Sequence, residues 1–287
     1  MNFRGNRQPF GKLPSGDRRG GLGTISRMLG LFPPRSSSPR GPARYRAYAI
    51  GDVHGRLDLL DGLLAAVEQD DSRRGSRKTY LVFLGDLIDR GPASRQVVER
   101  LRTYQPEHMT PVFLMGNHEE VLVRLLQGEQ GLLQSWLKFG GAECIESYGV
   151  DPRHLQRQPE KDALRIIAEA IPREHAEFLG SFADTFKFGD YLFVHAGIRP
   201  GVEIAAQEST DLRWIRQPFL DDDTDHGFVV VHGHTVREQI EERPNRVGID
   251  TGAYRTGVLT AMGVEGPNRW YISTIVEPSG IAAVTID

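Results

Sequence analysis

From residue 45 onward, apolar and polar positions follow two alternating patterns. Residues 45–50 form a short β-prone run, and the run at 79–84 is almost continuously apolar. Between them, apolar residues recur at the spacing of one helix face: Leu57, Leu60, Leu63, Leu64 and Val67. A second helical pattern at 96–104 precedes another β-prone run at 111–115. This order predicts right-handed crossovers and parallel strands.

The second half of the chain is predicted to be mostly strands. Residues 119–181 have a helical pattern, whereas 185–188 and 191–195 regain strand character across Gly189-Asp190, a favourable hairpin turn. Four more β-prone segments follow, at 228–232, 246–250, 257–264 and 270–276. We therefore expect one α/β domain (α+β in some classifications) over residues 44–287, with a helical insertion at about 119–181.

The N-terminal segment has a different composition. Residues 1–43 are rich in Gly, Pro, Ser and Arg, so they are expected to form a disordered tail. Residues 1–46 contain ten Lys or Arg residues and a single acid, Asp17, although the whole chain has a net charge of −3. Such a tail could contact acidic partners or an anionic membrane surface. It also resembles an organelle transit peptide, and no specific nucleic-acid binding is expected.

Composition limits the cellular setting. No apolar run approaches the roughly 20 residues of a membrane span, so no transmembrane segment is expected. The single cysteine, Cys144, excludes an intramolecular disulfide framework and a Cys-rich zinc site. Because this usage fits a reducing compartment, we expect a cytoplasmic protein.

Side chains suited to metal ions follow the predicted strands. The first three strands are followed by GDVHG (51–55), GDLIDRG (85–91) and GNHE (116–119), and later strands end in FVHAG (193–197) and HGHT (232–235). Ligands of α/β sheets gather beyond the carboxyl ends of the strands, so these groups should converge. Carboxylate, amide and imidazole donors can hold two adjacent divalent ions, a pair that promotes hydrolysis of phosphate esters.

In order and together, the five motifs resemble the phosphoprotein phosphatase branch of the calcineurin-like metallophosphoesterases. Within that branch, the chain is most similar to the bacterial and phage serine/threonine protein phosphatases and to the related diadenosine tetraphosphatases. The similarity covers about residues 45–276 and includes the segments 136–141, 214–216 and 249–253. It implies a metallophosphatase fold, with a central β-sandwich flanked by helices.

The resemblance also implies a role for each motif residue. Two divalent ions, manganese first with iron or zinc as alternatives, would be held by six residues: Asp52, His54, Asp86, Asn117, His195 and His234. Asp86 would bridge the ions. His118 would be the general acid that protonates the leaving oxygen, and Asp89 would orient it. Arg90 and Arg216 would clamp the phosphate.

These roles give three functional hypotheses. The first is a serine/threonine protein phosphatase, a hydrolase in which a hydroxide shared by the metals attacks the phosphorus of a phosphoprotein. The second is a hydrolase of dinucleoside polyphosphates such as diadenosine tetraphosphate. The third is an inactive scaffold that binds phosphorylated partners, which predicts a broken ligand set, yet no expected ligand is missing. Met115 replaces a basic residue that several relatives use for phosphate, so substrate preference could differ.

Overall fold

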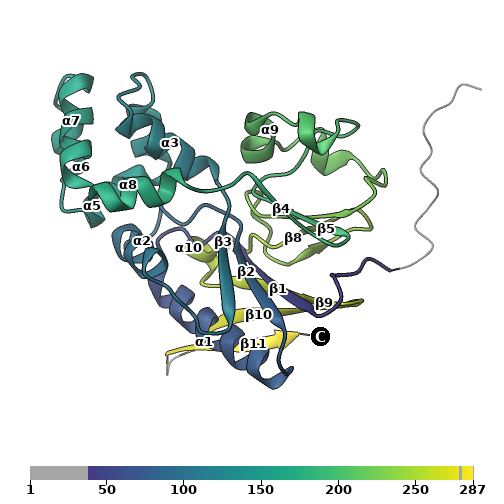
Figure 1. Ribbon diagram of the computed structural model, residues 1–287. Coiled ribbons are helices and arrows are strands. Elements are labelled where there is room, and N and C mark those ends of the chain that lie inside the picture. Colours follow the sequence, from purple (N-terminus) through teal and green to yellow (C-terminus); the bar gives the residue numbers. More distant parts are fainter. Residues whose placement is uncertain (1–37, 278–279, 287) are drawn as a thin grey trace, which may run out of the picture. The chain divides into compact units, whose positions relative to one another are not determined.

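The computed structural model describes residues 38–277 and 280–286. Two mixed β-sheets and their flanking helices make up this part of the chain (Figure 1), which confirms the expected α/β class with two sheets flanked by helices. The six-stranded sheet runs in the order β11 (Gly280–Ile286), β10 (Asn268–Glu277), β9 (Thr260–Glu265), β1 (Tyr45–Ile50), β2 (Lys78–Phe83) and β3 (Met109–Phe113). The tail predicted over 1–43 lies outside the described residues, except for 38–43.

The five-stranded sheet is built from the second half of the chain. Its order is β4 (Thr185–Phe188), β5 (Tyr191–Val194), β6 (Val229–His232), β8 (Arg246–Gly248) and β7 (Glu241–Glu242). The hairpin predicted around Gly189-Asp190 joins β4 to β5, which pair antiparallel. Strands β5, β6 and β8 are parallel neighbours, so their carboxyl ends point the same way.

Parallel pairing at the start of the chain follows the predicted order. β1 pairs with β2 and β2 with β3, both in parallel. Helices α1 (Leu57–Arg73) and α2 (Ser94–Arg102) make the crossovers between these strands. The apolar face predicted for α1 is buried in the structure, as its helical spacing requires.

Side chains of β1 alternate between the two faces of the six-stranded sheet and contribute to a core on each face. Tyr48 and Ile50 are fully buried in the core that the six-stranded sheet shares with the helices. Ala47 and Ala49 point the opposite way, into a core shared with residues of the five-stranded sheet such as Phe193. Successive strand side chains point to opposite faces, so one strand can serve two cores. The result is a helix layer, then one sheet, then the other.

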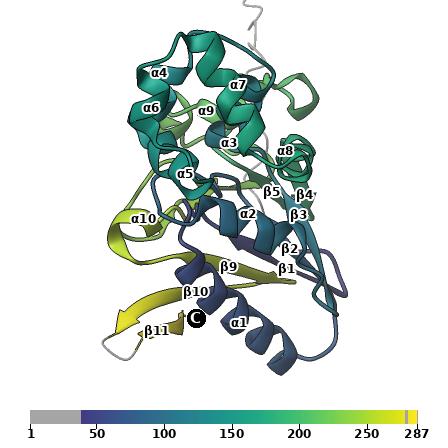
Figure 2. The same ribbon diagram turned by 90° about the vertical axis from the view of Figure 1, so that its left-hand side faces the viewer.

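Between β3 and β4 the chain is helical: α3 (Asn117–Leu126), α4 (Leu133–Trp136), a π-helical turn (Leu137–Gly141), α5 (Ala142–Ser147), α6 (Pro152–Gln156), α7 (Glu160–Ala170) and α8 (Arg173–Gly180). Figure 2 shows α3 to α8 gathered together, whereas α1 lies beside β10 and β11. The remaining helices are short: 3-10 turns at Ile204–Ala206 and Phe219–Asp221, α9 (Ser209–Trp214) and α10 (Ala253–Thr256). Within the described ranges, no helix combines the length and apolar character needed to cross a membrane.

Trp270 on β10 offers a test of the helix-facing core. Its ring packs edge-on against Tyr48 with centroids 5.7 Å apart, and its Nε1–H donates to Asp70 Oδ2 at 2.9 Å. Trp270→Ala should lower the free energy of unfolding by about 3–5 kcal/mol, measured by urea denaturation. Phe139→Ala is the matched control, because that ring is 60% exposed and its removal leaves no buried cavity. Equal losses for the two variants would contradict the packing.

Candidate metal centre and adjoining cavity

The motif side chains follow the strands whose carboxyl ends meet at one end of the sandwich. Asp52 follows β1 and Asp86 follows β2, while Asn117 comes shortly after β3 and opens α3. From the other sheet, His195 directly follows β5 and His234 lies two residues beyond β6. Because β1–β3 are parallel within one sheet and β5–β6 within the other, two sets of strand ends supply one site.

Asp86 is central to this cluster. Its carboxylate oxygens lie 3.4 Å from His195 Nε2, 3.6 Å from His54 Nε2 and 3.9 Å from His118 Nε2. Two groups of buried side chains, His54–Asp86–His118 and Asp86–His195–His234, each bring their ligand atoms within 4.8 Å of one another. Asp86 is the member common to both, the position that a bridging carboxylate needs.

Asn117 and Asp52 occupy different places around this centre. The Asn117 Oδ1 atom lies 2.8 Å from His234 Nδ1 and 3.0 Å from His195 Nε2. Asp52 belongs to neither group, and its carboxylate accepts a hydrogen bond from the backbone N–H of His234 at 3.0 Å. The structure thus brings four of the predicted ligands around Asp86, namely His54, Asn117, His195 and His234. The ligand roles of all six residues stay predictions.

The donor atoms fit divalent metal ions. His234 Nε2 is buried and has no hydrogen-bond partner among the described residues, an arrangement that is costly without a ligand. Burial lowers the pKa values of His54 and His234, the latter to about 3, which keeps both imidazoles neutral as metal ligation requires. Burial tends to lower the pKa of His195, but the nearby Asp86 carboxylate outweighs it and raises this pKa. The extra proton on His195 would leave when a cation binds.

Backbone strain is concentrated at this site. Six non-glycine residues in the described ranges have positive φ angles, and only one of them, Arg44, lies outside the motifs. The other five are His54, Asp86, Asp89, Arg90 and His234, with φ between 46° and 70°. Residues in this region cost free energy and persist where the surrounding structure enforces them, typically at functional sites.

Two glycines of the motifs are required by close approach. A Cβ atom at Gly116 would lie 2.3 Å from Asp86 Oδ1, and one at Gly233 would lie 2.0 Å from Asp52 Oδ1. Both distances are far below van der Waals contact, and the atoms concerned belong to carboxylates of the candidate site. With the Asp86 and Asp52 carboxylates in their present positions, Gly116 of GNHE and Gly233 of HGHT therefore cannot be replaced by a residue with a side chain.

His118 is held beside the cluster by a carboxylate. Its Nδ1 lies 2.6 Å from Asp89 Oδ2, which also accepts a hydrogen bond from Trp136 Nε1 at 3.1 Å. Despite burial, the charges of Asp86 and Asp89 raise the pKa of His118 to about 9, so the ring carries a proton at neutral pH. With Nδ1 engaged by Asp89, Nε2 is the nitrogen left to donate to a substrate. It lies 3.1 Å from an Arg90 guanidinium nitrogen.

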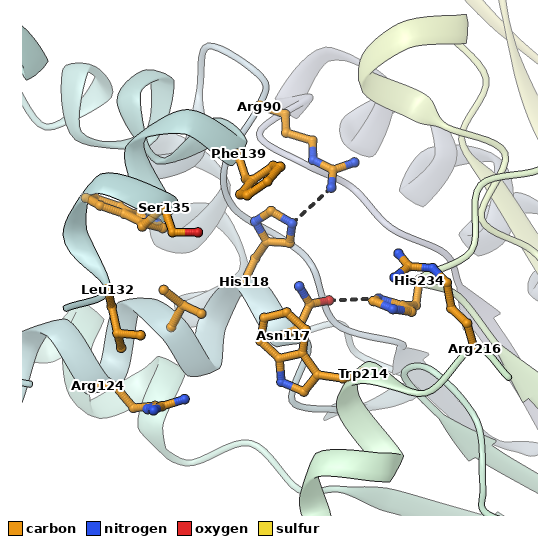
Figure 3. Close-up of a pocket in the computed structure, with 12 residues that line it drawn as sticks. Arg90, Asn117, His118, Arg124, Leu132, Ser135, Phe139, Trp214, Arg216 and His234 are labelled. Atoms are coloured by element: carbon orange, nitrogen blue, oxygen red, sulfur yellow. Dashed lines mark hydrogen bonds between the residues drawn. The ribbon is translucent and has the colours of Figure 1, made fainter.

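A cavity of about 340 Å³ adjoins the cluster (Figure 3). Its charged and polar lining residues are Arg90, Asn117, His118, Arg124, Ser135, Arg216 and His234. Its apolar and aromatic lining residues are Val121, Leu132, Trp136, Phe139 and Trp214. Both predicted clamp residues, Arg90 and Arg216, line this cavity. Met115 does not, because its side chain is buried in the core, whereas Arg124 of α3 supplies a further guanidinium.

Sequence reasoning gave no site role to two acidic residues that the structure places here. The Glu119 carboxylate accepts hydrogen bonds from the backbone N–H groups of Asp86 and Leu87, each at 2.8 Å, and so fixes the loop that carries Asp86. It also accepts from the backbone N–H of Gly116 at 3.2 Å, the one contact that its position three residues after the helix N-cap could have indicated.

Asp250 is the second residue that was missed. It is 2% exposed, one carboxylate oxygen accepts from Gly252 N–H at 2.9 Å, and the other has no partner in the part of the chain described. Burial, together with the Asp250 charge, raises the pKa of Asp52. Its place two residues beyond β8 follows the same strand-end rule as the recognised motifs.

Comparison with known proteins places these features in a family. Residues 45–257 match the model of the calcineurin-like phosphoesterases. An asymmetrical bis(5'-nucleosyl)-tetraphosphatase of Oceanobacillus iheyensis is 33% identical over 230 residues, covering 74% of this chain and 86% of the relative. That of Halalkalibacterium halodurans is 28% identical over 234 residues, covering 74% and 87%. A crystal structure of a candidate diadenosine tetraphosphatase has the same fold, with a TM-score of 0.54, 20% identity and coverage of 90% and 97%.

Metal content tests the central position of Asp86. Asp86→Asn should lose at least one bound divalent ion per chain, because the amide lacks the charge that both groups of ligands share. Atomic spectroscopy of protein equilibrated with manganese measures the content, and Asp58→Asn on the exposed face of α1 is the matched control. Unchanged manganese content in Asp86→Asn would contradict the bridging assignment.

Proposed function

Because this chain belongs to the calcineurin-like phosphoesterase family, we propose that it hydrolyses dinucleoside tetraphosphates with the help of two divalent metal ions. The cavity beside the metal cluster carries the proposal. Its guanidinium groups of Arg90 and Arg216 form no ion pair with a carboxylate in the described ranges, so they can receive phosphates. The same cavity continues into apolar and aromatic walls, which suit a nucleoside better than a polar peptide backbone.

The sequence analysis placed protein phosphatase first and dinucleoside polyphosphate hydrolase second. The relatives support the second hypothesis, since those cited are named tetraphosphatases and match across 86–87% of their own lengths. Metal ligands alone do not separate the two activities, because both hydrolyse a phosphate ester or anhydride at the same kind of centre. The substrate must therefore be distinguished by the cavity that surrounds the phosphate.

The predicted metal ligands are Asp52, His54, Asp86, Asn117, His195 and His234, and the donor set accepts manganese, iron or zinc. Bound there, two such ions would supply Lewis-acid stabilisation of the phosphate and a water of lowered pKa. Glu119 would keep the Asp86 loop in place through its bonds to backbone N–H groups. Arg90 and Arg216 would bind phosphate oxygens and offset the charge of the polyphosphate.

His118 would hold the proton that the departing oxygen takes up. Asp89 would stabilise the protonated ring through Nδ1, and Nε2, which lies 3.1 Å from an Arg90 guanidinium nitrogen, would face the phosphate that Arg90 binds. When water attacks phosphorus and the bridging P–O bond breaks, the proton on Nε2 would pass to the leaving oxygen. A nucleotide leaves as a phosphate, whose second pKa is near 6, and so depends on this proton less than a serine alkoxide does.

His118→Asn tests the proton donor. On an alkyl phosphate such as phosphoserine, turnover should fall by about 10²–10⁴-fold, because the alkoxide needs protonation. On p-nitrophenyl phosphate and on diadenosine tetraphosphate the loss should be smaller, since these leaving groups depart as weaker bases. Metal content should match that of the wild type. Equal losses on all three substrates would show that His118 acts on the metals or the phosphate instead.

A substrate panel tests the proposed function itself. With manganese present, the wild-type protein should convert diadenosine tetraphosphate with a kcat/KM at least about tenfold above that for phosphoserine peptides, a difference of about 1.4 kcal/mol in activation free energy. Chromatography of the nucleotide products and phosphate release from the peptides give the two rates. A chelator should abolish both activities. The reverse preference would support the protein phosphatase hypothesis.

A further inference from the structure

Two exposed aromatic rings line the cavity beside His118. Phe139 is 60% exposed and Trp214 is 38% exposed, although aromatic side chains of this size are usually buried in a core. The other large hydrophobic residues that are exposed in the described ranges lie on β10 and β11, outside the cavity. Both exposed aromatic rings therefore belong to one concave site.

Phe139 is presented by the π-helical turn Leu137–Gly141, which interrupts the helical chain between α4 and α5. Gly140 in this turn has a φ of 119°, and its carbonyl oxygen accepts the backbone N–H of Arg90 at 2.9 Å. A Cβ atom at Gly140 would lie 2.5 Å from Arg90 Cγ, so the turn and the arginine are in direct contact. The backbone that carries Phe139 is thus fixed relative to a predicted phosphate clamp.

Trp214 is held by a second set of contacts. It ends α9, and its Nε1–H donates to Glu120 Oε2 of α3 at 3.1 Å. Because this bond satisfies the polar edge of the indole, the faces of the ring are available for apolar contact. Arg216, the other predicted clamp residue, follows two positions later in the chain. In Figure 3, Phe139 and Trp214 lie on either side of the His118 and Asn117 side chains.

We infer that Phe139 and Trp214 form a binding site for one nucleobase of a nucleoside polyphosphate, whose phosphates reach Arg90 and Arg216. The inference rests on the proposed function and identifies which walls of the cavity receive the nucleoside. Aromatic rings bind bases through their π-faces, and every base has such a face. At about 340 Å³ the cavity is at the lower end of small-molecule sites, so it is assigned one base rather than two.

Stacking also predicts the breadth of base recognition. A site that uses ring faces tolerates different bases, in contrast to one that reads their hydrogen-bonding edges. Diguanosine tetraphosphate should therefore be hydrolysed with a kcat/KM within about tenfold of that for the diadenosine compound. A much stronger preference for one base would require edge contacts that this inference does not include, and would contradict it.

ATP and inorganic tripolyphosphate form a matched pair of ligands, because they have equal numbers of phosphates and only ATP has a nucleoside. Their competitive inhibition constants are measured against p-nitrophenyl phosphate with manganese-loaded protein. The wild type should bind ATP more tightly than tripolyphosphate. Phe139→Ala and Trp214→Ala should each raise the inhibition constant of ATP by about 5- to 150-fold, and change that of tripolyphosphate by less than about twofold.

Conservative variants separate stacking from general apolar contact. Phe139→Leu keeps an apolar side chain without a ring face, and should weaken ATP binding almost as much as Phe139→Ala. Trp214→Phe keeps a ring but loses the hydrogen bond to Glu120, so its effect should be smaller than that of Trp214→Ala. Val276→Ala, exposed on β10 and outside the cavity, is the control and should leave both inhibition constants unchanged.

The outcomes separate this inference from the proposed function. Suppose that the wild type hydrolyses diadenosine tetraphosphate, but that Phe139→Ala and Trp214→Ala bind ATP as tightly as the wild type. The inferred base site is then wrong and the proposed function stands. If phosphopeptides are the better substrates but ATP binding still depends on Phe139 and Trp214, the base site stands and the function is wrong. If the variants lose ATP and tripolyphosphate equally, the rings only support the arginines, which overturns the inference.

Discussion

The burial of one carboxylate, Asp86, is the constraint on which the site depends. The side chain is 2% exposed, and removing such a charge from water is costly unless opposite charges and hydrogen bonds compensate. In the protein alone, burial opposes ionisation, yet the imidazoles of His195 and His118 hold the pKa of Asp86 well below its usual value. Those same positions surround the place where divalent cations would supply stronger compensation.

The fold satisfies this constraint through two kinds of rigid support. Parallel strands bring the donors together from both sheets, and no single loop supplies the whole set. Glu119 then binds the backbone of the Asp86 loop, and Gly116 leaves room for the carboxylate. The positive φ angles at His54 and His234 belong to the same arrangement, because packing elsewhere must hold these residues in an unfavourable conformation.

The sequence predicted the features that depend on local pattern. A short β-prone run placed β1, and the strand-end rule located the motifs around Asp86, because both signals are contained in a few consecutive residues. It began β3 at Pro111, whereas the strand starts at Met109 and tolerates the proline because β3 is at the sheet edge. It missed β11, although four of the seven residues of that strand are β-branched. The strand pairs with β10.

What the sequence could not predict is where the cavity walls come from. Phe139 and Trp214 are separated by most of the helical segment and by the β4–β5 hairpin, and neither belongs to a ligand motif. They meet the same cavity because a π-helical turn contacts Arg90 and because α9 is bonded to α3 through Glu120. Under the proposed function, the metal cluster would therefore act on the phosphate bond, whereas long-range packing would select what is attached to the phosphate. Motifs alone favoured a protein phosphatase, since they describe only the first of these.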